Sequence, residues 1–151
     1  MRLAPIIASG FGVGYAPAAP GTAGALLGLA LGTALLAVSP AALALGAVVV
    51  TAVGLWAIDR ALAGDPARDP GWVVIDEVAG QMVALLGVAW RPSAAGLLIA
   101  FALFRLFDIA KPGPVGWADR RSGPAFVMAD DVIAGGLAAA GTAILLRAIA
   151  L

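Results

Sequence analysis

The chain has 151 residues, of which 62% are hydrophobic and 12% are charged, and nine basic residues balance nine acidic ones. So few charges cannot cover the surface of a small water-soluble monomer, which makes lipid the better-matched solvent. The lack of a basic excess argues against a nucleic-acid binder, and the absence of Cys and His excludes disulfides, thiol nucleophiles, Ser-His-Asp triads and imidazole metal sites.

A Gly/Pro-rich segment at 10–24, GFGVGYAPAAPGTAG, is the first element along the chain. Its glycines allow close backbone approach, its prolines stiffen it, and Thr22 is a suitable N-cap for the helix that follows. Amides at a helix start can hold an anion, so Gly21 and Thr22 are candidate phosphate contacts. The glycines interrupt the apolar run that a signal peptide needs, and the segment lacks the ending of a Walker loop.

Two membrane spans are predicted next, at 22–38 and 41–58, on either side of a Ser-Pro pair. No charged residue occurs between Arg2 and Asp59. A helix needs roughly 17 to 25 apolar residues to cross a hydrocarbon core, so each stretch is just long enough to span the membrane.

A ridge of small residues, Gly24, Gly28 and Gly32, runs along the first of these spans. This spacing lets another helix approach closely. We expect that helix to come from the same chain, with a homodimer through the three glycines as the alternative.

Three further apolar stretches follow, at 72–90, 92–110 and 131–151, and each has charged residues near one end. The sequence therefore predicts an all-α membrane bundle of about five apolar helices after the Gly/Pro-rich loop, with 1–151 as a single domain. The charged residues of the three stretches are, in order, Asp76 and Glu77, Arg105 and Asp108, and Asp130 and Asp131.

The orientation of the bundle follows from its connections. Those between spans one and two and between spans three and four are very short, so we expect tight hairpins on one side and all polar segments on the other. Six basic residues fall on the polar side, against Arg91 and Arg147 opposite, which places the polar side in the cytoplasm by the positive-inside rule. The six are Arg2, Arg60, Arg68, Lys111, Arg120 and Arg121.

Five carboxylates carry the functional prediction, namely Asp76, Glu77, Asp108, Asp130 and Asp131. Ionisable groups at the membrane boundary are costly and indicate function unless a structural partner explains them. The topology brings these five to one depth, where they repel each other unless a cation intervenes. Oxygen ligands without His or Cys favour Mg²⁺ as that cation.

A structural alternative is that acids in the first turn of a helix only stabilise its dipole. Asp108 lies near a helix C-terminus, where the dipole disfavours it, and this shifts the balance toward a site. Arg105, Asp108 and Lys111 share a helix face. Their spacing fits an ion-pair ladder and a pair of phosphate ligands, Arg105 and Lys111, equally well.

Several short sequence motifs occur in a fixed order along the chain. Together they identify a family far more specifically than any one motif does. They are Gly10-Phe11-Gly12 with Pro17, Pro20-Gly21-Thr22 and Gly24; Asp76-Glu77 with Gly80; Phe104-Arg105, Asp108, Lys111-Pro112 and Pro114; Asp119; and Met128 with Asp130-Asp131 and Ala134-Gly135. With these motifs the chain resembles the bacterial phosphatidylglycerophosphatase A family over nearly its whole length. Two positions depart from that pattern: Ala25 replaces a frequent serine, and 123–126 replaces a usually glycine-rich stretch.

The resemblance implies a magnesium-dependent phosphatase of the bacterial inner membrane that converts phosphatidylglycerol phosphate into phosphatidylglycerol, with a site that faces the cytoplasm. In this hypothesis one or two Mg²⁺ ions and the substrate phosphate meet at the acidic motifs. The predicted catalytic residues are Asp76, Glu77, Asp108 and Asp131; the metal ligands are Asp76, Glu77, Asp130 and Asp131; and the phosphate contacts are Arg105, Lys111, Gly21 and Thr22. Asp108 is a further metal ligand or the base that activates water.

Two alternatives of other classes are a small cation or proton transporter and a non-catalytic helical membrane subunit. Transporters place intramembrane charges along a path through the bilayer. Here the charges gather at one end of the spans, which argues against transport. In a non-catalytic subunit, substitution of the acids would change stability without changing any turnover.

Overall fold

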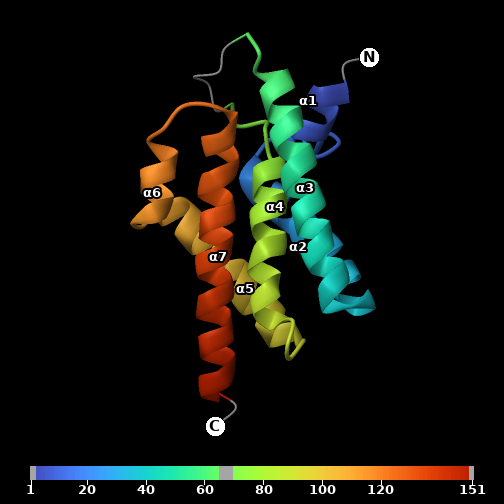
Figure 1. Cartoon of the computed structure of the whole chain (residues 1–151), viewed down its shortest axis with the longest axis vertical. Helices are drawn as coiled ribbons and strands as arrows, with labels where there is room; N and C mark the ends of the chain where they lie inside the picture. The colour runs from blue at the N-terminus through green and yellow to red at the C-terminus, as the bar shows by residue number, and fades with distance from the viewer. Residues whose placement is uncertain (1–2, 65–69, 150–151) are drawn as a thin grey trace.

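The computed structural model describes residues 3–64 and 70–149, and the regular secondary structure in these ranges is all helical, without a strand (Figure 1). Arg2 and Arg68, which the orientation prediction counts, lie outside them. The helices are α1 (Leu3–Ala8), η1 (Val13–Tyr15), α2 (Pro20–Val38), α3 (Pro40–Ala61), α4 (Ile75–Ala84), η2 (Leu85–Val88), α5 (Ala94–Ala110), α6 (Pro114–Asp119) and α7 (Pro124–Ile149), where η denotes a 3₁₀ helix.

Five of these helices correspond to the predicted apolar stretches. Within the described ranges α2, α3 and α7 are long and apolar enough to cross a membrane. The third predicted span is shorter than expected, because α4 has 10 residues and then tightens into η2. The tightening coincides with Gly87, whose position leaves no room for a side chain next to the backbone of Ala139 on α7.

Side-chain caps form the two tight hairpins. The Ser39 hydroxyl accepts a hydrogen bond from the amide of Ala42 at 2.9 Å, and Pro40 occupies the first position of α3. The Ser93 hydroxyl accepts one from the amide of Gly96 at 3.1 Å and begins α5. Both hairpins lie at one end of the bundle, and α1, α6 and the starts of α4 and α7 lie toward the other, which we call the polar end (Figure 1).

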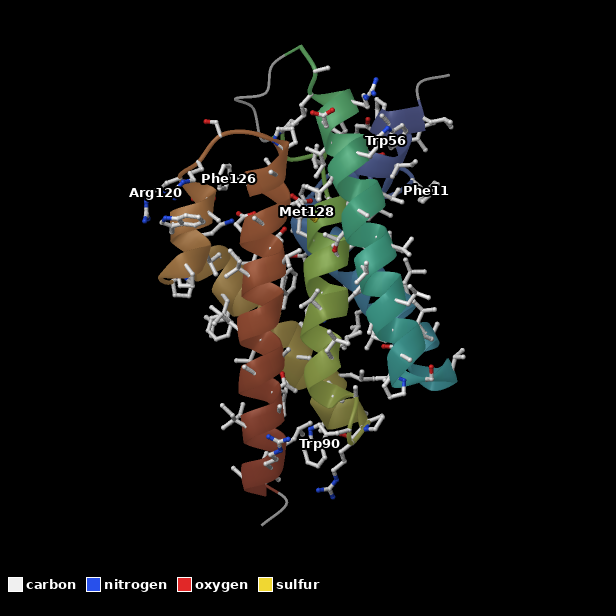
Figure 2. All side chains as sticks on the ribbon, in the orientation of Figure 1. Phe11, Trp56, Trp90, Arg120, Phe126 and Met128 are labelled. Carbon is white, nitrogen blue, oxygen red and sulfur yellow. The ribbon has the colours of Figure 1, made fainter. Side chains whose placement is uncertain are left out.

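The surface of the bundle fits a lipid environment. Large apolar side chains on the long helices are exposed, among them Leu45, Val48 and Ile144 at 65% each. Figure 2 shows Trp56 and Trp90 near opposite ends of the bundle, where tryptophans at a membrane–water interface would lie.

The glycine ridge of α2 packs inside the chain. A Cβ added at Gly24 would lie 2.8 Å from Val74 Cβ, and one at Gly28 would lie 2.6 Å from the carbonyl oxygen of Val78. Gly32 is buried in the same way against Leu85 and Leu43. The expected intrachain role is therefore confirmed, and the alternative of a homodimer through this ridge is wrong, since these glycines are covered by neighbouring helices of the same chain.

A second close crossing joins α4 to α7. A Cβ at Gly80 would lie 2.5 Å from the carbonyl oxygen of Asp131, and one at Gly135 would lie 3.0 Å from the carbonyl carbon of Gly80. Each glycine follows an acidic residue by four positions, Asp76 on α4 and Asp131 on α7. The crossing therefore brings acidic residues from distant parts of the sequence to within one helical turn of the contact.

Two helix starts differ from the sequence prediction. α2 begins at Pro20 after Ala19, whose φ is 48°, so Ala19 is the N-cap and Thr22 is the third residue of the helix. α7 begins at Pro124 after Gly123, whose φ is 112°, so Asp130 and Asp131 do not open this helix. In both cases proline is favoured in the first helical turn. Because the dipole effect is confined to that turn, it does not account for the second acidic pair.

Candidate active site

Three carboxylates from two helices converge near the polar end. Asp76 and Glu77 lie in the first turn of α4, and Asp131 lies on α7 beside Gly80. One oxygen from each lies within 4.8 Å of the others. Asp76 is 5% exposed and Asp131 is 3% exposed. The predicted convergence of distant acids is thus confirmed for these three residues.

Such a group is unfavourable without a cation. Burial removes the water that stabilises each charge, and neighbouring negative charges repel. Glu77 Oε2 and Asp131 Oδ1 are buried and accept no hydrogen bond from the described part of the chain. Closely spaced, buried oxygens from three carboxylates fit a hard divalent cation such as Mg²⁺.

A set of ion pairs adjoins the acidic group. Arg105 Nη1 donates a hydrogen bond to Asp108 Oδ2, and both side chains are largely buried. Asp108 also lies near enough to Asp131 for their carboxyl groups to interact. Asp108 therefore joins the acidic group to the basic residues at the end of α5.

Lys111 connects three elements at the polar end. It ends α5 with a left-handed backbone, and its Nζ lies 3.5 Å from Asp108 Oδ1, 3.2 Å from Asp119 Oδ1 and 2.5 Å from Asp130 Oδ2. Burial disfavours its charge, but the hydrogen bond to Asp130 and the surrounding carboxylates outweigh this and raise the pKa of Lys111 above its usual value. The spacing of Lys111 leaves two roles open, an ion-pair ladder and a phosphate ligand. These contacts match the ion-pair ladder and extend it to α6 and α7.

Asp130 does not join the group of three. Its Oδ2 pairs with Lys111, and its Oδ1 accepts a hydrogen bond from the amide of Asp131 at 3.0 Å. The two members of the second acidic pair thus point to different partners, because consecutive residues on a helix lie about 100° apart. Of the four predicted metal ligands, the structure brings together Asp76, Glu77 and Asp131.

The start of α2 faces this site. A Cβ at Gly21 would overlap Glu77 Oε1 and lie 3.5 Å from Arg105 Nη1, so only glycine leaves this space open. Gly21 and Thr22 are the second and third residues of α2, where amides have no intrahelical acceptor. Arg105 Nε is buried without a partner in the described chain. Free donors from two helices therefore adjoin the three carboxylates.

Two polar residues near the site were absent from the predicted site set. Gln81 is fully buried one helical turn after Glu77, and its amide has no hydrogen-bond partner among the described residues. Gln81 follows Glu77 by four residues and so shares its face of α4, and this spacing is the sequence signal for its position near the site. Asp119 contributed only to the family resemblance, and its pairing with Lys111 depends on α6, which the sequence did not predict.

Replacing Lys111 by Gln is expected to destabilise the protein by about 2 kcal/mol, because Asp108, Asp119 and Asp130 lose a shared charged hydrogen-bond donor. Thermal unfolding in detergent measures this effect. Arg120→Gln is the matched control, since Arg120 is an exposed basic residue of the same region. Equal midpoints for the two variants would contradict the connecting role of Lys111.

A family model and two of three relatives identify the same family. The family model for phosphatidylglycerophosphatase A matches residues 6–146. A Bacteroides thetaiotaomicron protein, provisionally named a phosphatidylinositol-3-phosphatase, is 43% identical over 136 residues, covering 86% of this chain and 85% of the relative. Phosphatidylglycerophosphatase A of Haemophilus influenzae is 37% identical, covering 85% and 80%, and that of Escherichia coli is 30% identical, covering 89% and 78%. No solved structure matches the chain.

Proposed function

Because this chain belongs to the phosphatidylglycerophosphatase A family of lipid phosphatases, we propose that it hydrolyses the terminal phosphate of phosphatidylglycerol phosphate to give phosphatidylglycerol. The observation that carries this proposal is the convergence of Asp76, Glu77 and Asp131 beside Arg105 and the start of α2. A phosphate monoester is an anion that needs cationic charge and hydrogen-bond donors around it, and this arrangement offers both.

Asp76, Glu77 and Asp131 would hold Mg²⁺, which supplies positive charge to the phosphate and to the attacking water. Arg105 is placed to donate to phosphate oxygens through its free Nε. The amides of Gly21 and Thr22 are placed to donate from the opposite side. These donors and the acids together define the phosphate position.

Asp108 is better suited to orient Arg105 than to act as the base that the sequence suggested. Its carboxylate accepts a hydrogen bond from Arg105 and lies 3.5 Å from Lys111. The Asp108 carboxylate is therefore already engaged by two neighbouring cations. Asp130 in turn holds Lys111 and contributes to the site indirectly.

The proposed location is the bacterial cytoplasmic membrane, with the chain as one domain and α4 and α5 within the membrane alongside α2, α3 and α7. Apart from Arg105, the described basic residues support a cytoplasmic polar end, with four there and two opposite. The four are Arg60, Lys111, Arg120 and Arg121; the two are Arg91 and Arg147. The gathering of ionisable groups at one end also favours a phosphatase over a transporter.

The test is phosphate release by purified protein from phosphatidylglycerol phosphate and from phosphatidylinositol 3-phosphate, each with Mg²⁺ and with EDTA. We expect release that requires Mg²⁺ and is faster from phosphatidylglycerol phosphate. Faster release from the inositol lipid would overturn the proposed substrate, in line with the name of the Bacteroides relative. No release from either lipid would overturn the proposed activity.

A further inference from the structure

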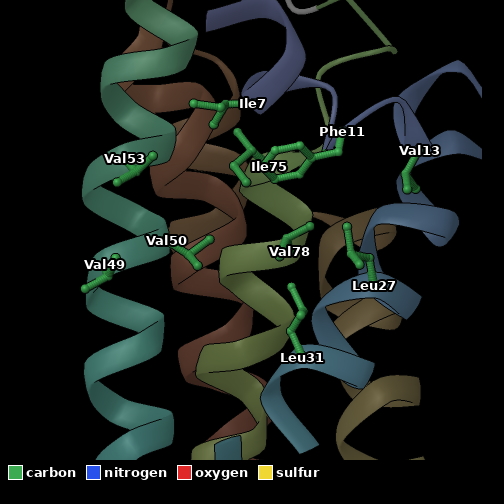
Figure 3. A pocket seen from close by; sticks show the side chains of 11 residues that line it. Ile7, Phe11, Val13, Leu27, Leu31, Val49, Val50, Val53, Ile75 and Val78 are labelled. Atoms are coloured by element: carbon green, nitrogen blue, oxygen red, sulfur yellow. The ribbon is translucent and has the colours of Figure 1, made fainter. Parts of the chain in front are cut away.

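An apolar groove lies on the side of α4 that faces α2 and α3 (Figure 3). Its volume is about 440 Å³. The walls are formed by Leu27 and Leu31 on α2 and by Val50 and Val53 on α3, and Ile75 and Val78 on α4 form the floor. Among residues 3–64 and 70–149, none with a charged side chain lines the groove. A polar ligand would lose its hydrogen bonds with water there and gain none from these side chains.

The groove begins next to the acidic group. Ile75 and Val78, which form its floor, flank Asp76 and Glu77 directly in the sequence of α4. The same turn of α4 therefore presents carboxylates toward the site and aliphatic side chains toward the groove. A ligand with a charged end and an apolar end could occupy both without crossing the body of the protein.

The Gly/Pro-rich segment covers the groove at the polar end. A Cβ at Gly10 would lie 3.2 Å from Val74 and 3.4 Å from Leu27, so this segment packs on both α4 and α2. The following residue, Phe11, has a φ of 58° and is 78% exposed, and Figure 3 shows its ring reaching toward Ile75. An aromatic ring at this position can contact hydrocarbon just below a headgroup.

We propose that this groove binds one acyl chain of the lipid substrate while its phosphate lies at the acidic group. The inference rests on the proposed function. The two walls, α2 and α3, are candidate membrane spans, so the groove opens toward hydrocarbon. Each buried methylene adds to the affinity for an acyl chain, which makes the groove a determinant of chain-length preference.

A second apolar groove of about 440 Å³ provides an internal control. It lies between α3, the end of α4, η2 and α7, and its lining includes Val48, Leu55 and Leu86. The Gly/Pro-rich segment does not contribute to it. The two grooves are similar in size and polarity, so general contact with lipid would affect both alike. Only the first groove is covered by the segment that leads to the start of α2, so specific binding of the substrate would affect the first groove alone.

The experiment compares phosphatidylglycerol phosphate carrying two sixteen-carbon chains with a water-soluble form carrying two four-carbon chains. Val53→Trp fills the first groove, and Val48→Trp is the matched control in the second. We expect Val53→Trp to raise the KM for the long-chain lipid roughly tenfold and to leave the short-chain KM within about twofold, because two or so methylene contacts are lost. Val48→Trp is expected to change neither value.

Leu31→Phe, a smaller intrusion into the same groove, should give the same pattern in weaker form and covers the case in which Val53→Trp does not fold. Equal KM changes for both chain lengths, or a long-chain effect in Val48→Trp as large as in Val53→Trp, would overturn the groove assignment while leaving the phosphatase activity in place. Failure of the unsubstituted protein to release phosphate from either lipid would instead overturn the proposed function.

Discussion

Replacing Asp131 by Asn is expected to reduce Mg²⁺-dependent phosphate release by about 100- to 1,000-fold, and Asp76→Asn is expected to have a similar effect. Asn has nearly the shape of Asp but no charge, so the group of three loses a third of its negative charge without losing its packing. The assay is phosphate release from phosphatidylglycerol phosphate in detergent micelles at saturating Mg²⁺.

The control for these two variants is Asp59→Asn, since Asp59 is an exposed acid at the end of α3, outside the acidic group. It should retain the activity of the unsubstituted protein. Because the charge repulsion among the buried acids is relieved, Asp76→Asn and Asp131→Asn should unfold at or above the normal temperature when Mg²⁺ is absent. Undiminished phosphate release by both variants would contradict the metal-site assignment.

Replacing Gly80 by Val is expected to destabilise the protein by about 3 kcal/mol and to reduce phosphate release. The new side chain would collide with the backbone of Asp131 and the ring of Phe104, because a Cβ here lies 2.5 Å and 2.6 Å from their nearest atoms. Backbone cannot move aside as a flexible side chain can. α4 and α7 would therefore separate, and Asp76 would move away from Asp131.

Gly136→Ala is the matched control on α7, since a Cβ at that position would meet no atom of the other described helices within 4 Å. Alanine favours a helix over glycine by roughly 1 kcal/mol, so this variant should be as stable as the unsubstituted protein or more so. Thermal unfolding in detergent measures both variants. A Gly80→Val protein that unfolds at the same temperature as Gly136→Ala would show that the close crossing is not required.

The helices and hairpins could be predicted because their signals are local. The charge-free run after Arg2 and the Ser39-Pro40 pair depend on residues adjacent in the sequence, and a helix cap acts over three residues. The convergence of Asp76 with Asp131 was also predictable in outline, since short hairpins bring the ends of alternate helices to the same side.

The details of the site were not predictable, because they depend on helix phase and on contacts across the bundle. Because α7 begins at Pro124, both acids lie within the helix, with Asp130 directed toward Lys111 and Asp131 toward α4. The predicted helix begins at residue 131, seven residues later, and so leaves the direction of Asp130 undetermined. The lack of a hydrogen-bond partner for the Gln81 amide among the described residues likewise follows from its burial by other helices. The residue pattern within one helix contains no information on contacts between helices that are distant in the sequence.

The most direct measurement is the position of a bound divalent ion, obtained from the anomalous scattering of Mn²⁺ in crystals of the protein grown with that metal. We expect an anomalous peak bound by oxygens of Asp76, Glu77 and Asp131, and we expect it to disappear in Asp131→Asn. A peak held elsewhere in the molecule, or none at concentrations of Mn²⁺ that support phosphate release, would contradict it.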